Sequence, residues 1–381
     1  MKMIKTYIVT VFLGALMWSC QSDQGQHEDE TPQSLREAYA DDFLIGTALG
    51  YSQLIASSEK EQALIAAQFS VVTPENMMKW ERIHPEPYTF NFGLPDSLIE
   101  LASRNNQKVF GHTLAWHSQT PDWLFEDSLG NLIDTATLFA RMEHHINNVA
   151  GRYKGKILGW DVVNEALNND GSYRNSKYYQ IAGEEFIFKA FEYAAKADPN
   201  AELYYNDYSM NVQSKVDGAV EIATKVRDKG LRIDGIGMQG HWGIDRPSID
   251  LIEQSILKIH DAGFKVAITE LDIDVLPNPY RIEGANISDS FENNAEANPY
   301  ADGLPDSVNQ AHAQRYEELF KLFLKHKDKI DRVTFWGVHD GHSWKNDWPA
   351  RGRTNYCLVF DRNLDPKLAY DKIMTLKSET H

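Results

Sequence analysis

The chain has 381 residues, of which 42% are hydrophobic and 24% charged, so it is long enough to bury a full-sized core. Its 17 Phe, 17 Tyr and 9 Trp exclude a disordered chain, and its two cysteines, Cys20 and Cys357, are too few for a disulfide framework or a cysteine-rich zinc site. The formal net charge of −17 repels phosphate backbones, so we expect no nucleic-acid partner.

Residues 1–20 have the pattern of an export signal. Lys2 and Lys5 give a positive start, and a short apolar run follows from Tyr7 to Trp18. It is the chain's only apolar run long enough to matter for a membrane, which excludes a multi-span membrane protein.

The segment that ends at Cys20 is similar to a bacterial lipoprotein signal, in which the cysteine after the cleavage site takes the lipid. We therefore expect a secreted protein that is lipid-anchored through Cys20 to the outer membrane or cell surface. The alternative is ordinary secretion with an unmodified cysteine. Residues 21–40 are expected to form a flexible tether, and residues 41–381 the folded domain, in which Cys357 packs as a small hydrophobe.

From Asp42 onward, short apolar runs rich in β-forming residues alternate with longer helical patterns. Most of these runs are continuously apolar, which is typical of parallel strands buried on both faces. The expected strands are Phe43–Leu49, Phe69–Thr73, Lys108–Thr113, Ile157–Asn164, Glu202–Asn206, Gly235–Gln239, Lys265–Glu270 and Arg332–Gly337.

Helical patterns fill the intervals between the expected strands. The clearest are Glu59–Gln68, Glu184–Ala197, Val212–Lys229 and Ile249–Ala262. Eight strand–helix units favour an α/β fold of the (β/α)8 TIM-barrel type in a single catalytic domain. An open doubly wound sheet is the alternative, but no glycine-rich phosphate loop follows the first strand.

One long irregular stretch, Leu276 to Val308, follows the seventh expected strand and is rich in Asn, Pro, Asp and Gly. In a barrel it would lie at the active face, either with a function there or as a tolerated surface insertion.

Polar and aromatic residues gather where the expected strands end. In a barrel these positions share one mouth, where this architecture builds its active sites. They are Glu75, Asn76 and Lys79; His112, Trp116 and His117; Asn164 and Glu165; Asn206, Asp207 and Tyr208; Gln239, His241 and Trp242; Glu270, Asp272 and Asp274; and Trp336, His339, Asp340 and Trp344.

Glu165 and Glu270 stand out because each is the first acidic residue at the end of a long apolar run. Two carboxyl groups that face one cavity push their pKa values apart, so that one is an acid while the other is an anion. A pair of carboxyl groups, one protonated and one ionised, can cleave a glycosidic bond. Trp116, Trp336 and Trp344 suit the flat apolar face of a sugar ring, although core packing is the commoner role of a single Trp.

The histidines allow a metal hypothesis, with His112 and His117, or His339 and His342, as ligands. Neither pair has the i, i+4 spacing that places two histidines on one helical face, and we expect no metal. His144 and His145 lie within a helical pattern and are expected at the surface.

The chain closely resembles glycoside hydrolase family 10, the endo-β-1,4-xylanases, from about Phe43 to Leu376. The resemblance rests on motifs that occur in order along the chain: Thr73–Trp80, Gly111–Gln119, Trp160–Ala166, Gly237–His241, Ile268–Asp272 and Phe335–Val338.

The resemblance implies a TIM barrel and a retaining mechanism, with Glu165 as acid/base and Glu270 as nucleophile. His241 would hold Glu270, and Tyr208 would stack against the sugar on the leaving-group side. Residues implied to line the sugar sites on the non-reducing side are Glu75, Asn76, Lys79, His112, Trp116, Asn164, Gln239, Trp336 and Trp344.

Two stretches depart from the family pattern: Ser209 follows Tyr208 where the family often has Asn, and the register of Trp344 to Arg353 differs. The expected activity is endo-cleavage of xylan and xylo-oligosaccharides by a monomer without a cofactor. Its alternatives are a glycan-binding barrel at the cell surface and a β-1,4-glucanase of the same barrel type.

Overall fold

The computed structural model describes residues 34–280 and 290–378. The expected signal peptide, the lipid site at Cys20 and residues 21–33 of the expected tether lie outside the described residues. None of the helices within the described ranges is both long and apolar enough to cross a membrane.

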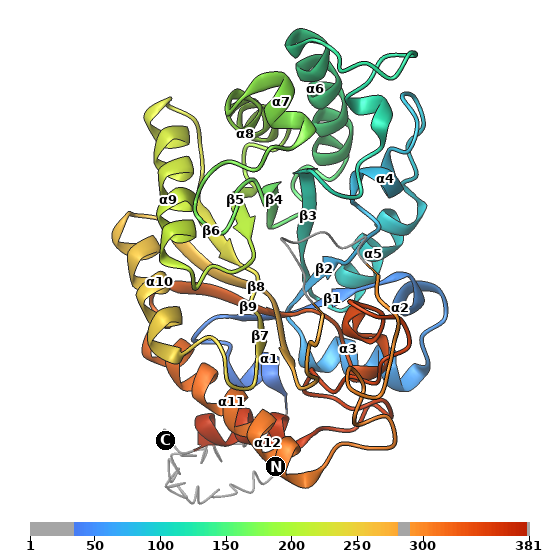
Figure 1. Ribbon diagram of the computed structural model, residues 1–381, viewed down its shortest axis with the longest axis vertical. Helices are drawn as coiled ribbons and strands as arrows, with labels where there is room; N and C mark the ends of the chain where they lie inside the picture. The colour runs from blue at the N-terminus through green and yellow to red at the C-terminus, as the bar shows by residue number, and fades with distance from the viewer. Residues whose placement is uncertain (1–33, 281–289, 379–381) are drawn as a thin grey trace, which may run out of the picture. The chain divides into compact units, whose positions relative to one another are not determined.

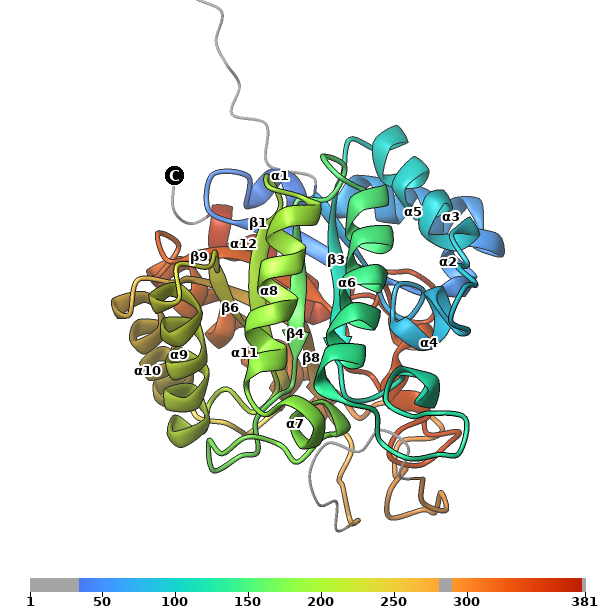
Figure 2. The same ribbon diagram turned by 90° about the horizontal axis from the view of Figure 1, so that it is seen from above.

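Within the described residues, eight parallel strands close into a barrel with helices around it (Figures 1 and 2). Neighbours follow chain order from β1 to β6; β8 then pairs with β6, and β9 closes the ring on β1. These strands are β1 (Leu44–Leu49), β2 (Val71–Pro74), β3 (Lys108–Trp116), β4 (Gly159–Asn164), β5 (Glu202–Asp207), β6 (Gly235–Met238), β8 (Lys265–Asp274) and β9 (Ile330–Phe335). The predicted TIM barrel is therefore confirmed.

A helix follows each barrel strand and covers the outside of the barrel (Figure 2). In chain order these are α3 (Glu59–Gln68), α5 (Gly93–Arg104), α6 (Thr135–Arg152), α8 (Glu185–Ala197), α9 (Gln213–Asp228), α10 (Ile249–Asp261), α11 (Asp306–Lys325) and α12 (Leu368–Ser378). The shorter helices are α1 (Leu35–Ala38), α2 (Tyr51–Ile55), α4 (Trp80–Ile83) and α7 (Lys177–Ala182), with 3-10 turns at Asp122–Leu124, Asp340–His342 and Trp344–Asn346.

Local signals set the ends of several of these helices. The Ser58 and Ser248 side chains accept hydrogen bonds from the first-turn amides of α3 and α10. Gly263, just beyond α10, has a φ of 87°, which ends the helix in a conformation that other residues rarely adopt. The expected bounds of these helices therefore agree with the structure to within a residue.

The end of the barrel where the strands begin is filled by side chains. Val71, Phe110, Tyr204 and Ala267 form a small buried cluster there. The Arg332 guanidinium lies 3.3 Å from the centre of the Phe110 ring, so its charge is held against an aromatic face. With this end packed, only the opposite end, where the strands finish, is left for a cavity.

The structure corrects the expected start of the folded domain. The segment from Leu35 to Tyr39 forms α1 and its cap, and both of these side chains are buried in the main core. The boundary between tether and barrel therefore lies before Leu35 rather than at residue 40. Leu35 and Ala38 are apolar, but a four-residue helix is too short to give a periodic signal.

His145 was expected at the surface, and that prediction is wrong. It lies on the inner face of α6, fully buried, with its ring stacked 3.6 Å from the ring of Trp80. Its neighbour His144 is exposed, as expected. Burial lowers the pKa of His145 well below its usual value, so it is a neutral packing residue.

Two other expectations concern the second half of the chain. Cys357 is buried without a disulfide, as predicted, and its Sγ lies 3.0 Å from Ser343 Oγ. The described parts of the Leu276–Val308 stretch have no regular helix or strand before α11 begins at Asp306. A short extra strand, β7 (His241–Gly243), was not predicted; it pairs with the end of β8.

Candidate active site

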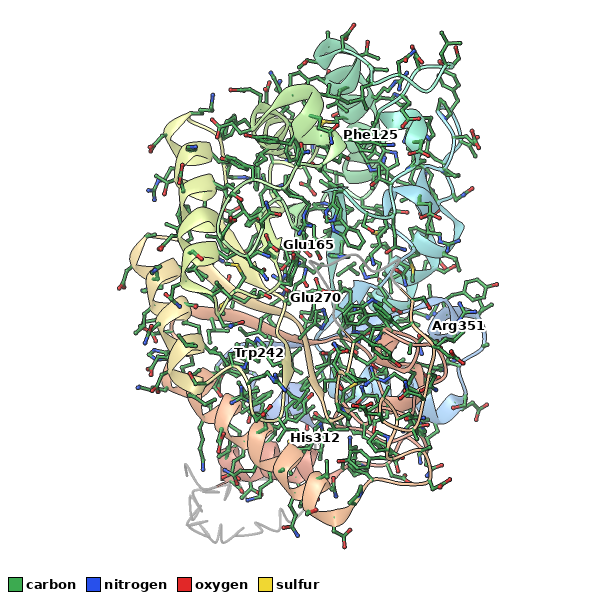
Figure 3. All side chains as sticks on the ribbon, viewed as in Figure 1. Phe125, Glu165, Trp242, Glu270, His312 and Arg351 are labelled. Atoms are coloured by element: carbon green, nitrogen blue, oxygen red, sulfur yellow. The ribbon has the colours of Figure 1, made fainter. Side chains whose placement is uncertain are left out.

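One cavity of about 710 Å³ lies at the end of the barrel where the strands finish. Every catalytic and sugar-binding residue implied by the resemblance lines it: Glu75, Asn76, Lys79, His112, Trp116, Asn164, Glu165, Tyr208, Gln239, His241, Glu270, Trp336 and Trp344. Other residues expected at the mouth do not line the cavity: His117, Asn206, Asp207, Trp242, Asp272, Asp274, His339 and Asp340. The lining residues come from loops or strand ends all around the barrel, so the closed sheet brings together residues that are far apart in sequence. Figure 3 shows Glu165 and Glu270 near each other at the centre of the molecule.

Glu270 lies within β8 rather than at its end, because the strand continues to Asp274. Both of its carboxylate oxygens have donors: Asn206 Nδ2 lies 2.8 Å from Oε1, and His241 Nε2 lies 3.2 Å from Oε2. Burial alone would raise the pKa of Glu270, but the hydrogen bond from His241 and nearby positive charges outweigh it and lower the pKa. Glu270 is therefore held as an anion.

His241 lies between two carboxylates. Its Nε2 faces Glu270, and its Nδ1 is 3.0 Å from Asp272 Oδ2. Burial disfavours its charged form, but Asp272 and Glu270 together raise the pKa of His241 to about 9. At neutral pH the ring is thus an imidazolium that donates to Glu270 through Nε2 and forms an ion pair with Asp272 through Nδ1. The resemblance implied that His241 holds Glu270, and the geometry agrees.

Glu165 follows β4 and has different surroundings. Its Oε1 accepts hydrogen bonds from the amides of Gln239 (2.9 Å) and Asn164 (3.4 Å), while its buried Oε2 has no partner among the described residues. Its backbone φ is 57°, an unusual value for a residue with a side chain. The backbone is held by the bond from Glu165 N–H to Asn206 O (2.9 Å) and by Arg174 Nε, which donates to Glu165 O (3.0 Å).

Amide side chains connect the two carboxylates. Asn206 Nδ2 donates to Asn164 Oδ1 (3.0 Å) as well as to Glu270, and Gln239 Nε2 also lies 3.4 Å from Asn164 Oδ1. Because amides are neutral at any working pH, this network fixes the positions of both carboxylates without changing its own charge.

A polar wall is formed by residues that follow β2 and β3. Lys79 Nζ donates to Asn76 Oδ1 (2.9 Å) and to Gln119 Oε1 (3.0 Å), and lies 4.8 Å from the centre of the Trp116 ring. Burial lowers the pKa of Lys79, and the negative charge of Glu75 opposes this change. Together these residues present donors, acceptors and one aromatic face, which suit sugar hydroxyls and a sugar ring.

The adjoining part of the wall is aromatic. His112 Nδ1 pairs with Asp161 Oδ2 at 2.9 Å, and the His112 ring packs edge-on against Trp336 at 5.3 Å. Trp344 Nε1 donates to Asp272 Oδ2 (2.8 Å), and the Trp344 ring stacks on Trp348 with centres 5.1 Å apart. The paired residues hold each ring in one orientation toward the cavity.

Tyr208 is fixed by two cations. Arg174 donates to its hydroxyl at 2.7 Å, and Lys215 Nζ lies 3.3 Å from the centre of its ring. Lys215 is fully buried and forms an ion pair with Asp207 at 2.7 Å. Arg174 thus contacts both the backbone of Glu165 and the side chain of Tyr208.

The donor chemistry does not favour a metal at either histidine pair. Among the described residues, neither His112 nor His117 belongs to a group of three side chains close enough to share an ion. Glu61, His339 and His342 do form such a group, with donor atoms 3.1–3.5 Å apart. However, the Gly341 N–H donates to His339 Nδ1, which places the ring proton on Nε2, the atom that would face the ion. The group is therefore best described as a hydrogen-bond network.

The roles of several lining and supporting residues were not predicted from the sequence. Asn206 was expected at the mouth, but its bonds to Asn164 and Glu270 were not predicted, and Gln119 ends the Gly111–Gln119 motif. Arg174, Lys215 and Ser290 carried no signal, since each lies in a loop or helix without a chemical pattern. Lys345, Asp347, Trp348 and Arg351 also line the cavity, and they fall in the stretch that departs from the family register.

The chain resembles known proteins along nearly its whole described length. Residues 34–376 match the family model for glycosyl hydrolase family 10. The chain is 46% identical to "Endo-1,4-beta-xylanase A" of Xylanibacter ruminicola, over 88% of this chain and 90% of that protein. It is 40% identical to "Beta-1,4-xylanase" of Dictyoglomus thermophilum, over 90% of each. A solved family 10 endoxylanase from a sugarcane soil metagenome superimposes with a TM-score of 0.86 at 45% identity, covering 90% of this chain and 99% of that one.

Proposed function

Because the chain belongs to glycosyl hydrolase family 10, we propose that Glu270 and Glu165 are the nucleophile and the acid/base of a xylan-cleaving site. The enzyme is an endo-1,4-β-xylanase that retains the anomeric configuration. The observation that carries the assignment of roles is the contrast between the two carboxylates. Glu270 is an anion with a donor on each oxygen, whereas one buried oxygen of Glu165 has no donor in the part of the chain that the structure describes.

In the first step, Glu270 attacks the anomeric carbon while Glu165 protonates the departing glycosidic oxygen. The bond from the sugar to the leaving chain breaks as the covalent bond to Glu270 forms. In the second step, Glu165 removes a proton from water, which displaces Glu270 and regenerates both groups. Retention requires the two carboxyl groups to lie about 5–5.5 Å apart, and we expect this separation in a crystal structure.

The experiment that tests this function is the hydrolysis of unbranched xylohexaose, followed by proton NMR from the first seconds. A retaining endo-enzyme releases internal products whose new reducing ends are first in the β configuration. An α product would contradict the assignment of Glu270 as nucleophile. Equal turnover of cellohexaose would favour the β-1,4-glucanase, because a site shaped for pentose rings leaves little room for the hydroxymethyl group of glucose. Binding of xylohexaose without cleavage would favour the glycan-binding alternative.

We also propose that the enzyme is held at the bacterial surface by a lipid on Cys20. The support is the sequence from Leu16 to Cys20, which is similar to a lipoprotein signal. Cys20→Ala should release the protein from the membrane fraction, whereas Cys357→Ala, which changes a buried cysteine of the barrel, should not. Unchanged membrane association of the Cys20→Ala variant would disprove the anchor.

A further inference from the structure

The cavity wall carries one cation whose role the reaction does not explain. Of the lysine and arginine side chains that line the cavity, Lys79 is buried and hydrogen-bonded, and Lys345 is buried 3.7 Å from Asp274. Arg351 differs, because it is exposed and has no hydrogen-bond or ion-pair partner among the described residues. Asp347 lines the same wall but accepts a bond from the Gly352 N–H instead (3.2 Å).

The backbone on both sides of Arg351 is firmly held. Phe291 N–H donates to Pro349 O (2.9 Å), and Asn293 Nδ2 donates to Gly352 O (3.0 Å). Arg353 follows, and its buried guanidinium donates to Ala297 O (2.9 Å) and Pro277 O (3.0 Å). The segment that presents Arg351 is therefore attached to the loop after β8. These bonds fix the backbone from which the Arg351 side chain extends at the edge of the cavity.

Figure 3 shows Arg351 well to one side of Glu165 and Glu270. A group bound by Arg351 thus belongs to a part of the substrate away from the bond being cut. The neighbouring wall contains the stacked rings of Trp344 and Trp348, which offer an apolar surface to a sugar.

An unpaired guanidinium favours an anionic ligand. A guanidinium binds a carboxylate through two parallel hydrogen bonds, and an unbranched xylan backbone offers no anion at all. The anionic group that xylans carry is the carboxylate of a uronic-acid branch. The whole chain has a net charge of −17, so an acidic polymer needs a local cation at the cleft to offset general repulsion.

We propose that Arg351 forms an accessory binding site for the carboxylate of a uronic-acid branch on xylan. This inference rests on the proposed function, since it concerns the same cavity and the same polymer. It makes Arg351 a specificity-determining residue, because the cleaved bond is the same with or without the branch.

The experiment compares three substrates: glucuronoxylan, the same polymer with its carboxyl groups reduced to alcohols, and unbranched xylohexaose. The reduction removes the charge while leaving the branch in place. The variants are Arg351→Gln and Arg351→Glu. The matched controls are Arg104→Gln and Arg104→Glu, which make the same charge changes at another exposed arginine. Arg104 is the last residue of α5, at the end of the barrel where the strands begin.

Arg351→Gln should lower kcat/KM on glucuronoxylan about five- to tenfold, and Arg351→Glu should lower it further. Both variants should change kcat/KM on the reduced polymer and on xylohexaose by less than about twofold. The difference should shrink in molar salt, because the site is exposed. The Arg104 variants should match the wild type on all three substrates.

Two outcomes would overturn the proposal. One is an equal loss on all three substrates, which would mean that Arg351 binds the xylan backbone or supports the loop. The other is an unchanged kcat/KM on glucuronoxylan in both Arg351 variants. Failure of the proposed function looks different, because the wild type would then leave xylohexaose uncleaved.

Discussion

Glu165 and Glu270 face the same cavity, but the side chains around them differ in charge. Glu270 receives hydrogen bonds on both oxygens, one of them from the imidazolium of His241. Among the described residues, Glu165 receives bonds only from neutral amides, and only on one oxygen. The first environment stabilises an anion, as a nucleophile requires, and the second leaves an oxygen free to carry a proton.

The backbone conformations of Glu165 and Glu270 also differ. Glu270 lies inside β8, at an irregularity in the pairing of β8 with β9, and its N–H donates to Gln239 O (2.7 Å). Glu165 lies one residue beyond its strand at a φ of 57°, held by contacts with Asn206 and Arg174. A strained backbone at a functional residue persists only where the surroundings hold it in place. The acid/base thus depends on its loop contacts more than the nucleophile does.

The largest effect should come from Glu270→Ala. Without the nucleophile, every substrate loses the covalent step whatever its leaving group, so we expect kcat on xylan and on activated aryl xylobiosides to fall by more than about 10⁴-fold. Initial rates on both substrates measure this. A large loss on xylan with normal cleavage of the aryl glycoside would contradict the role of Glu270.

Glu165→Ala should separate the two substrates. A xylose leaving group needs the proton that Glu165 donates, so activity on xylan should fall about 10²–10⁴-fold. A nitrophenolate leaves without that proton, so the aryl xylobioside should still form the glycosyl-enzyme rapidly and give a burst. Azide should then speed turnover, because it attacks without losing a proton. Absence of both the burst and the azide effect would show that Glu165 is not the acid/base.

The sequence predicted the barrel and the lining of the cavity because both depend on short-range patterns. Continuous apolar runs mark buried parallel strands, and the polar residues that end them must meet once the sheet closes. Arg174 and Arg351 were not predicted because their roles depend on how loops fold back over the strand ends. His145 was misplaced because α6 packs against Trp80, a contact that the helical pattern alone does not reveal. The signal peptide and the Cys20 anchor remain predictions.

Replacing His241 tests whether a positive charge beside Glu270 distinguishes it from Glu165. Its pKa is raised from 6.5 to about 9 in the folded protein, so its contribution to stability is fully present below about pH 6.5 and is lost as the pH rises through 9. The wild type should lose on the order of 3 kcal/mol of unfolding free energy over that range, and His241→Gln should lose little.

His241→Gln should also lower kcat/KM on xylan roughly ten- to hundredfold at neutral pH, because a charged hydrogen bond to Glu270 becomes a neutral one. The exposed His144→Gln serves as the control and should match the wild type in both measurements. Urea unfolding between pH 6 and 10 measures the first effect. If His241→Gln kept the wild-type pH dependence of stability, the loss of stability at high pH would come from a group other than His241.

The smallest effect should come from Arg174→Met, which tests the backbone side of the comparison. Arg174 donates to the carbonyl oxygens of Glu165 and Leu167 and to the hydroxyl of Tyr208, so it links the acid/base to the leaving-group side of the cavity. We expect kcat/KM on xylohexaose to fall about tenfold, in line with the loss of one or two hydrogen bonds from a charged donor. The rate of glycosyl-enzyme formation from an aryl xylobioside should change by less than about threefold, because that step needs no proton. Arg174→Lys keeps the charge but not the planar fork, and it should recover only part of the loss. An equal fall on both substrates, or full recovery with lysine, would show that Arg174 supports the fold in general rather than the position of Glu165.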